Sequence, residues 1–272
     1  MPLPVLHQWS AASDDDLVRL YLQTDRRWAE HLAEPEVLEV GTAMCNPAMA
    51  GQANHVRDVA LPAGVCAEEA YRRVEAYFSE RGARCSAWIF GAAGGVSPVA
   101  TLVKLLGEKG YRIELTDVLA LPHMPGKPPA ERGDLQVIPS RAGFRQMREL
   151  FAEAGAELRR PHLPELAEAH LDDPHLDALL AMRDGRAVAH AGIFGVGELA
   201  RLGLFYVPPA FRRQGVGRTM LSHILEIARR SLYRHIFAGV TQSQSELSYL
   251  YHSVGMRKAG QVIEAVSPRS SE

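Results

Sequence analysis

The stretch Val207–Leu221 constrains the fold of this chain more than any other part of the sequence. An apolar segment, Leu199–Val207, runs into two prolines and a loop with two glycines, and the residues that follow, Gly217–Arg230, have the apolar spacing of an amphipathic helix. The segment before the loop is hydrophobic on both faces, which is typical of a central strand that helices cover on both sides. The sequence therefore predicts a strand–loop–helix unit within an α/β layered domain.

The glycine loop of this unit has the properties of an anion-binding site. The first amides of a helix have no intrahelical partner and carry the positive end of the helix dipole. Gly215 and Gly217 lack a Cβ, so an anionic group can approach the backbone closely. Three basic side chains add charge to the loop: Arg212, Arg213 and Arg218. The expected ligand is a di- or polyphosphate.

The spacing of the loop distinguishes between nucleotide-binding motifs. A P-loop requires a Lys, and a Rossmann fingerprint requires G-x-G-x-x-G, and the loop contains neither. The pattern V-x-P-x-x-R-x-x-G-x-G is complete from Val207 to Gly217 and resembles the acetyl-CoA signature of the GNAT superfamily of N-acyltransferases. The alternative is an ordinary glycine-bearing turn between a strand and a helix.

A second match lies downstream, at the distance usual in that family. The segment Gln244–Met256, QSELSYLYHSVGM, resembles N-x-x-A-x-x-L-Y-x-x-x-G-F and matches it at Leu250, Tyr251 and Gly255. Gln replaces Asn at its first position, and Met replaces Phe at its last. The resemblance implies that Tyr251 lies near the CoA sulfur, although a tyrosine at this spacing is also compatible with core packing alone.

The resemblance implies transfer of an acetyl group from acetyl-CoA to a primary amine, which attacks the thioester directly in a ternary complex. Tyr251 is then expected to protonate the leaving thiolate. A backbone N–H is expected to bind the oxyanion where the strand 199–207 bulges, near Gly203. For the general base, Glu198 and His190 are candidates, each with a structural role as its alternative. The residues expected to bind acetyl-CoA are Phe205, Val207, Arg212, Arg213, Gln214, Gly215, Val216, Gly217, Arg218, Thr219 and Gln244.

A proline- and glycine-rich seam at Leu121–Gly133 predicts two domains, 1–132 and 133–272. The stretch WIFGAAGGVSPVATLVKLLGEKGYR of the first resembles HIFAGVTQSQSELSYLYHSVGMRK of the second in layout: strand, loop, helix, glycine, strand. Chance similarity between two strand–helix units is the alternative to an internal repeat. Aligning Gly110 with Gly255 sets Leu106 opposite Tyr251, so the first domain lacks both the phosphate loop and the acid.

The predicted fold class is therefore α/β (α+β layered): a GNAT-like mixed sheet flanked by helices, preceded by a smaller, degenerate and non-catalytic GNAT-like domain that shapes or caps the acceptor site. The expected strands are 56–61, 86–90, 111–120, 135–139, 177–183, 186–194, 199–207, 234–240 and 257–264. The expected helices are 67–82, 98–110, 141–154, 164–171, 217–230 and 245–253.

Composition limits the partners. The 30 Lys and Arg residues against 32 Asp and Glu leave a net charge of −2, which does not favour nucleic acid or an anionic membrane. The three cysteines have no metal-ligand spacing, and without a long apolar run a reduced, cytoplasmic protein is expected. No metal is expected at His162, His170 and His175, where substrate contact or plain surface are the alternatives.

The acceptor and the oligomeric state stay open at this point. Two alternatives to an N-acetyltransferase also stay open. One is a non-catalytic acyl-CoA sensor or interaction module, and the other is transfer to a hydroxyl or of a longer acyl group.

Overall fold

A computed structural model of the chain describes residues 12–49, 53–92, 99–124, 134–242 and 244–268. Its strands are β1 Glu34–Leu38, β2 Gly41–Cys45, β3 His55–Arg57, β4 Ala87–Ala92, β5 Arg112–Leu121, β6 Gln136–Pro139, β7 Leu176–Arg183, β8 Arg186–Val196, β9 Leu199–Tyr206, β10 His235–Thr241 and β11 Arg257–Val266. Its α-helices are α1 Asp14–Glu30, α2 Ala67–Glu80, α3 Val99–Glu108, α4 Phe144–Leu158, α5 Leu163–Leu171, α6 Val216–Arg230 and α7 Ser245–His252.

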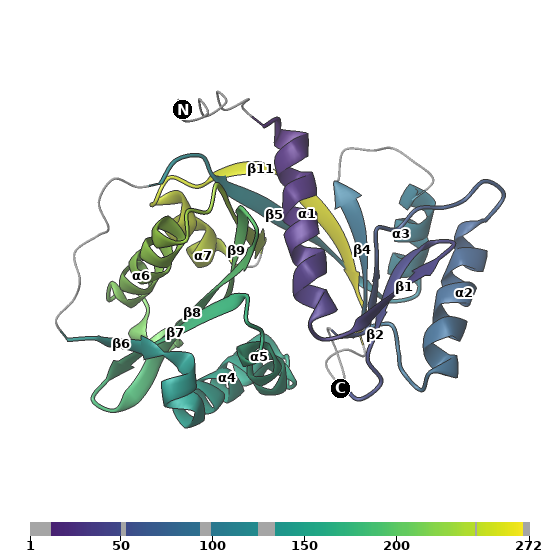
Figure 1. Ribbon diagram of the computed structural model, residues 1–272. Coiled ribbons are helices and arrows are strands. Elements are labelled where there is room, and N and C mark those ends of the chain that lie inside the picture. The colour runs from purple at the N-terminus through teal and green to yellow at the C-terminus, as the bar shows by residue number, and fades with distance from the viewer. Residues whose placement is uncertain (1–11, 50–52, 93–98, 125–133, 243, 269–272) are drawn as a thin grey trace, which may run out of the picture.

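All these strands join into one mixed, mostly antiparallel sheet, with the order β1-β2-β3-β4-β11-β5-β10-β9-β8-β7-β6. Helices α2 and α3 lie at one end of the sheet, and α4, α5, α6 and α7 lie at the other (Figure 1). Helix α1 crosses the middle and contacts strands of both ends. The predicted α/β class, a mixed sheet flanked by helices, is confirmed by this architecture.

The two halves of the chain, residues 1–132 and 133–272, exchange their last strands. Strand β5 leaves the N-terminal half and pairs with β10, from Ile236↔Leu121 to Thr241↔Thr116. Strand β11 leaves the C-terminal half and pairs with β4, while β5 and β11 also pair with each other. The hydrogen bonds of the sheet therefore run without interruption from one half into the other.

Each half contains one parallel strand–helix–strand unit. In the N-terminal half β3 and β4 are parallel and α2 connects them; in the C-terminal half β9 and β10 are parallel and α6 connects them. Each unit continues into a helix, α3 or α7, and the turn after that helix contains a glycine with positive φ, Gly110 at 89° and Gly255 at 93°. The layout predicted from the two similar stretches is thus present, and β5 and β11 follow these glycines.

The C-terminal elements agree with the predicted ranges to within a few residues, because their turn and cap signals are local. Asp184 and Gly185 both have positive φ, 52° and 76°, as a tight β-hairpin requires. In the N-terminal half the strand predicted at 56–61 is shorter and ends at Arg57. The helix predicted at 141–154 begins three residues later, at Phe144, whose side chain is 39% exposed.

The first helix and first two strands were not predicted. Helix α1 begins with a capping box in which the Asp16 amide donates to the Ser13 hydroxyl and the Asp16 carboxylate accepts from the Ser13 amide. It buries Leu17, Val18 and Tyr21 on one face. These signals are legible in the sequence. In the described part of the chain, no helix is both long and apolar enough to cross a bilayer.

Candidate active site

The parallel strands β9 and β10 separate halfway along their length. They pair from Leu199↔His235 to Leu202↔Ala238, and the pairing between the two strands then stops. At the same point β9 bulges against β8: the register shifts between Gly192↔Gly203 and His190↔Tyr206, so β9 carries one extra residue. Leu204 has a φ of 50°, which is unusual for a residue with a side chain. The irregularity predicted near Gly203 is therefore present, with its positive φ one residue later.

The side chain of His190 braces this bulge. Its Nδ1–H donates to the Leu204 carbonyl oxygen at 2.8 Å, and its ring packs edge-to-face on Phe151 with centroids 4.8 Å apart. Burial lowers the pKa of His190 to about 4, so the ring is neutral near pH 7. This arrangement supports the structural alternative for His190, because the ring holds the bulge in place.

Glu198, the other candidate base, lies at the far end of β9. It forms an ion pair with Arg234 at 3.0 Å. Six residues separate it from Leu204, which is about 20 Å along an extended strand. It lies too far from the bulge to accept a proton there directly.

Helix α6 begins just beyond the separated strand end. Gly215 precedes the helix with a φ of 83°, and the Thr219 amide makes the first intrahelical bond, to the Gly215 carbonyl at 3.0 Å. The amides before Thr219 have no intrahelical acceptor. The first turn of α6 contains no acidic residue, so the positive end of its dipole is not neutralised locally.

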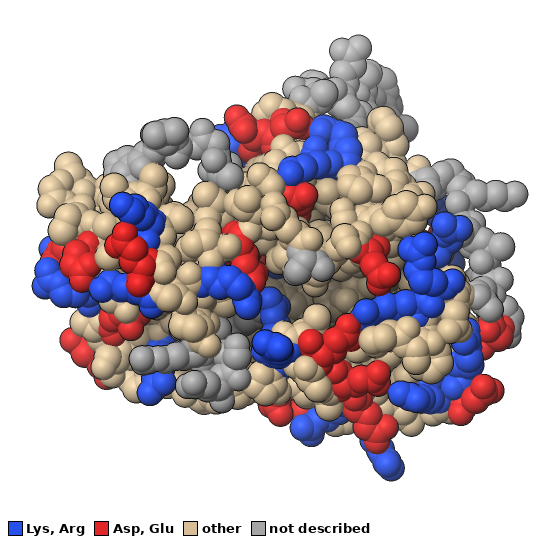
Figure 2. Space-filling model, turned by 180° about the vertical axis from the view of Figure 1, so that it is seen from behind, with Lys and Arg blue, Asp and Glu red and all other residues tan. Residues whose placement is uncertain are grey.

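A cavity of about 520 Å³ lies between β9, the start of α6 and helix α7. It collects eight of the predicted acetyl-CoA residues: Phe205, Val207, Arg212, Arg213, Gly215, Gly217, Arg218 and Gln244. A Cβ on Gly217 would lie 3.3 Å from Leu250 Cδ2, so this glycine lets α7 pack closely against the start of α6. Basic and acidic side chains are intermingled on the face shown in Figure 2, which is hollowed near its centre.

The arginines at this cavity have different surroundings. Arg212 is held in place: its Nε donates to the Val207 carbonyl at 2.9 Å and its Nη2 to Glu157 at 2.7 Å. Arg213 and Arg218 are exposed, and neither is in an ion pair with any residue that the structure describes. Arg212 therefore shapes the loop, whereas Arg213 and Arg218 are available to an anionic ligand.

Glu157 was not predicted from sequence, and its role depends on tertiary contacts. It accepts hydrogen bonds from Arg212 and from the Tyr206 hydroxyl, the latter at 2.8 Å. Nothing in the local pattern of α4 distinguishes this glutamate from its neighbours.

The other predicted acetyl-CoA residues do not line the cavity. Val216 is fully buried in the core, and the Thr219 hydroxyl donates to the Gly215 carbonyl at 3.3 Å. The Gln214 amide donates to the Ala210 carbonyl at 2.7 Å. These three side chains build the loop, so only their backbone groups are placed to meet a ligand.

Tyr251 lies behind the cavity and is not among its lining residues. Its side chain is 2% exposed and meets Phe205 edge-to-face, with centroids 6.0 Å apart. Burial raises the pKa of Tyr251 above its ordinary value, so the phenol is protonated near pH 7 and can act only as a proton donor. Phe205 brings it next to the bulge of β9.

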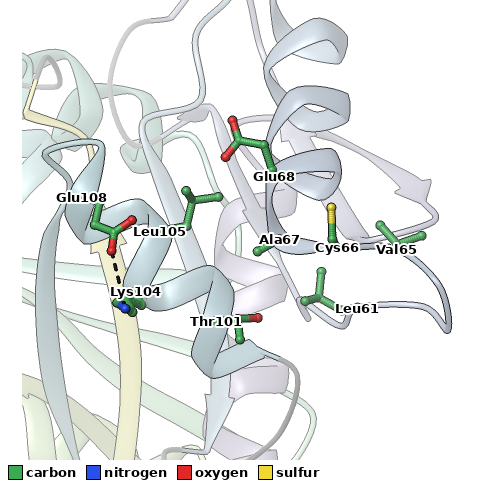
Figure 3. A pocket seen from close by; sticks show the side chains of 9 residues that line it. All are labelled: Leu61, Val65, Cys66, Ala67, Glu68, Thr101, Lys104, Leu105 and Glu108. Atoms are coloured by element: carbon green, nitrogen blue, oxygen red, sulfur yellow. Dashed lines mark ion pairs between the residues drawn. The ribbon is translucent and has the colours of Figure 1, made fainter.

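A second cavity, of about 620 Å³, lies in the N-terminal half between α2 and α3 (Figure 3). Its lining is mostly apolar: Leu61, Val65, Cys66, Ala67, Glu68, Thr101, Lys104, Leu105 and Glu108. This cavity lies between the start of α2 and the following helix α3, just as the first cavity lies between the start of α6 and the following helix α7. The first turn of α2, however, carries Glu68 and Glu69, which oppose an anion at the helix start.

The three histidines near α5 have separate environments. His170 is buried and stacks on Trp28, with ring centroids 3.6 Å apart. His175 is exposed and its Nδ1 lies 3.0 Å from Asp173, and His162 precedes α5. Among the described residues, no group of three or more His, Cys, Asp or Glu side chains is arranged to hold a metal ion.

The part of the chain that contains the cavity beside β9 and α6 matches a known protein family. Residues 144–256, which span the bulge, the α6 loop and Tyr251, match the acetyltransferase (GNAT) family. This part of the chain is therefore similar to a GNAT acetyltransferase domain. The match covers every residue predicted to bind acetyl-CoA, and a GNAT domain supports acyl transfer from acetyl-CoA as the general activity. No curated protein matches the chain significantly.

Solved structures place the GNAT domain within a larger shared fold. A GCN5-related N-acetyltransferase from Kribbella flavida has a TM-score of 0.61 at 15% identity, covering 96% of this chain and 97% of its own. One from Sphaerobacter thermophilus scores 0.53 at 18% identity, covering 72% and 65%. A tandem GNAT protein from the clavulanic acid biosynthesis pathway scores 0.52 at 12% identity, covering 74% and 69%. At these identities the likeness establishes the fold alone.

Proposed function

We propose that this protein is an N-acetyltransferase that transfers the acetyl group of acetyl-CoA to a primary amine by direct attack in a ternary complex. The observation that carries the proposal is the shared position of three features. The strand separation after Leu202, the bulge at Leu204 and the uncapped start of α6 all meet at one cavity.

Each part of acetyl-CoA has a chemically suitable surface at this cavity. The backbone amides before Thr219, together with the Arg213 and Arg218 side chains, can bind the pyrophosphate. The pantetheine amides can form hydrogen bonds with the backbone of β9 at Phe205 and Val207, where β9 no longer pairs with β10. Gln244 lines the same cavity, so it would lie beside the pantetheine arm. Its side-chain oxygen accepts a hydrogen bond from the Thr241 amide at 3.3 Å.

The chemistry then requires three groups. The neutral amine attacks the thioester carbon, and a backbone N–H at the bulge stabilises the oxyanion that forms. Collapse of the tetrahedral intermediate breaks the carbon–sulfur bond, and Tyr251 donates a proton to the departing thiolate. The amine loses its proton to water, since burial makes His190 a weak base with a pKa of about 4 and Glu198 is remote.

We propose further that residues 133–272 form the catalytic domain and residues 1–132 a degenerate GNAT-like domain without catalysis. The exchanged strands, the equivalent glycines and the acidic start of α2 support this division. Free cysteines at 45, 66 and 85 favour the cytoplasm as the compartment.

Acetyl-CoA binding measured by isothermal titration calorimetry, together with CoA release in the presence of a library of primary amines, tests the proposal. Binding and amine-dependent CoA release are expected. Tight binding without CoA release for any amine would instead support a non-catalytic acyl-CoA sensor. The mass of the product distinguishes transfer to nitrogen from transfer to a hydroxyl and acetyl from a longer acyl group.

A further inference from the structure

A cluster of charged side chains lies where α1, β3, β9 and β11 meet, on the far side of the bulge from α6. It consists of Asp25, Arg57, Arg201 and Glu264. Arg57 Nη2 lies 3.1 Å from one Asp25 oxygen, and Arg201 forms an ion pair with the other. A single carboxylate is therefore shared between two guanidinium groups that come from different halves of the chain.

Several buried donor atoms of this cluster are not satisfied. Arg57 is fully buried, and its Nε and Nη1 atoms have no hydrogen-bond partner among the described residues. Its Nε forms an ion pair with the Asp58 carboxylate at 3.9 Å, which balances charge but is too long for a hydrogen bond. The Nε atom of Arg201 is also buried and has no partner in the described part of the chain. Buried donors of charged groups are normally satisfied, so these three atoms indicate a missing acceptor.

Glu264 is a second carboxyl group of the cluster. It accepts a hydrogen bond from Thr116 at 3.2 Å and lies within electrostatic reach of Arg201. Burial, with a further contribution from the Asp25 carboxylate, raises the pKa of Glu264 to about 7. Near neutral pH this carboxyl is therefore ionised in only about half of the molecules.

The cluster adjoins the point of acyl transfer. Arg201 pairs with Phe237 in the register of β9 and β10, one residue before the last pair at Leu202. Gly203, where the strands separate, is two residues further and therefore about 7 Å along the strand. Burial raises the pKa of Tyr251, and the positive charge of Arg201 acts in the opposite direction.

The cluster can be reached from solvent through its outer members. The side chains of Arg201 and Asp25 are 15% and 20% exposed, whereas Arg57 lies behind them. The Trp28 ring, whose centroid lies 5.5 Å from the Arg201 guanidinium, forms an aromatic wall beside this opening. A ligand that enters here meets a guanidinium first and an indole next to it.

We propose that the acceptor is an amine that also carries a carboxylate, as an amino acid does, and that the guanidinium of Arg201 binds this carboxylate. This inference rests on the proposed acetyltransferase function of the same site. A guanidinium matches a carboxylate with two parallel hydrogen bonds, and burial strengthens them. Held at Arg201, the acceptor directs its amine toward the separated strands, where the acetyl group is expected.

The first test compares amino acids with their carboxamides, which have the same amine and side chain but no carboxylate. We expect kcat/KM with acetyl-CoA to be at least about 10-fold higher for the amino acids, because buried donors would be left unpaired by the amides. In Arg201→Gln the preference should fall to about 2-fold, through a rise in KM for the amino acids and little change in KM for the amides. Equal rates for both members of each pair in the wild type would overturn the proposal.

A second measurement does not depend on turnover. N-acetyl amino acids, the expected products, and their amides are titrated into the protein without CoA and followed by calorimetry. Saturable binding of the acids alone, and its loss in Arg201→Gln, would support the carboxylate site. If the acids bind in this way but acetyl-CoA does not bind, the carboxylate site is right and the proposed transferase function is wrong. Binding of acids and amides alike, or of neither, contradicts the site.

The variants are chosen to keep the fold. Removing the Arg201 guanidinium leaves Asp25 paired with Arg57 at 3.1 Å, so no buried carboxylate is left alone. Arg201→Lys keeps the charge but not the paired donors, and we expect its preference to be intermediate. If the glutamine variant does not fold, the lysine variant decides: an unchanged preference overturns the proposal, and a reduced one supports it.

Discussion

The two parallel strand–helix–strand units of this chain share a layout and differ in what precedes their helices. In the unit β9–α6–β10 a loop with a positive-φ glycine leads into a helix start with exposed arginines and no acids. In the unit β3–α2–β4 the helix follows Cys66 and begins with Glu68 and Glu69. The same framework can therefore present an anion-binding helix start or one that repels anions, depending on a few residues.

The helices that follow differ in the same way. Tyr251 and Leu106 each lie four residues before a glycine with positive φ, and both side chains are buried. Only Tyr251 has a proton to give. The comparison teaches that the framework and the chemistry are separable: the N-terminal half keeps the first and, on our proposal, lacks the second.

The exchange of β5 and β11 means that neither half has a complete sheet alone, and this gives the largest expected effect. Residues 133–272 expressed alone would leave the edges of β10 and β11 without β5. We expect this fragment to be insoluble or unfolded by circular dichroism, since a long unpaired edge exposes backbone groups and promotes aggregation. Coexpression with residues 1–124 should restore a soluble complex. A stable, monomeric fragment would show that the halves are independent.

The difference between Tyr251 and Leu106 predicts the next largest effect. Tyr251→Phe removes the proton donor and keeps the ring against Phe205, so we expect kcat to fall about 100-fold, within the range for loss of a general acid. Steady-state CoA release measures it. The matched control is Tyr71→Phe, which removes a phenol from the N-terminal half and should leave kcat unchanged. An equal effect of both variants would assign the loss to stability instead.

The difference between the starts of α6 and α2 predicts a smaller effect, on the binding of acetyl-CoA. Gly215→Val places a β-branched residue at a φ of 83°, which costs about 1–3 kcal/mol and distorts the loop. We expect acetyl-CoA to bind about 10- to 100-fold more weakly by calorimetry. Cys66→Val alters the equivalent residue before α2, which has an extended conformation with a φ of −81°, and binding should not change. Loss of binding in the Cys66 variant would contradict the assignment of CoA to one unit only.

Glu264, on the strand that enters the N-terminal half, predicts a pH effect on stability. Its folded pKa of about 7 lies above the ordinary value of 4.5, so the folded state holds the proton that the unfolded state releases between these values. Glu264→Gln should therefore raise the free energy of unfolding at pH 8 by about 1–3 kcal/mol relative to the wild type. The difference should shrink as the pH falls through 7 and vanish near 4.5. Urea titrations measure it, and a difference independent of pH would refute burial of an ionisable carboxyl as its cause.

The sequence predicted those features that depend on neighbouring residues. The α6 loop, the two strands at 177–183 and 186–194 and the segment containing Tyr251 were predicted close to their observed positions because glycine, proline and apolar spacing act locally. Helix α1 was legible in its capping box but was not predicted. The crossing of β5 and β11, and the sharing of Asp25 between two arginines, join residues far apart in the chain. No local pattern specifies such contacts.

Hydrogen exchange with and without acetyl-CoA tests the central claim most directly, because it reports on both units in one experiment. We predict that acetyl-CoA protects the amides at 205–219 and 244–251, and that 61–68 and 101–108, around the cavity between α2 and α3, exchange at the same rate in both conditions. Protection of the segments around the N-terminal cavity, or no protection at the start of α6, would contradict the assignment of acetyl-CoA to the C-terminal unit.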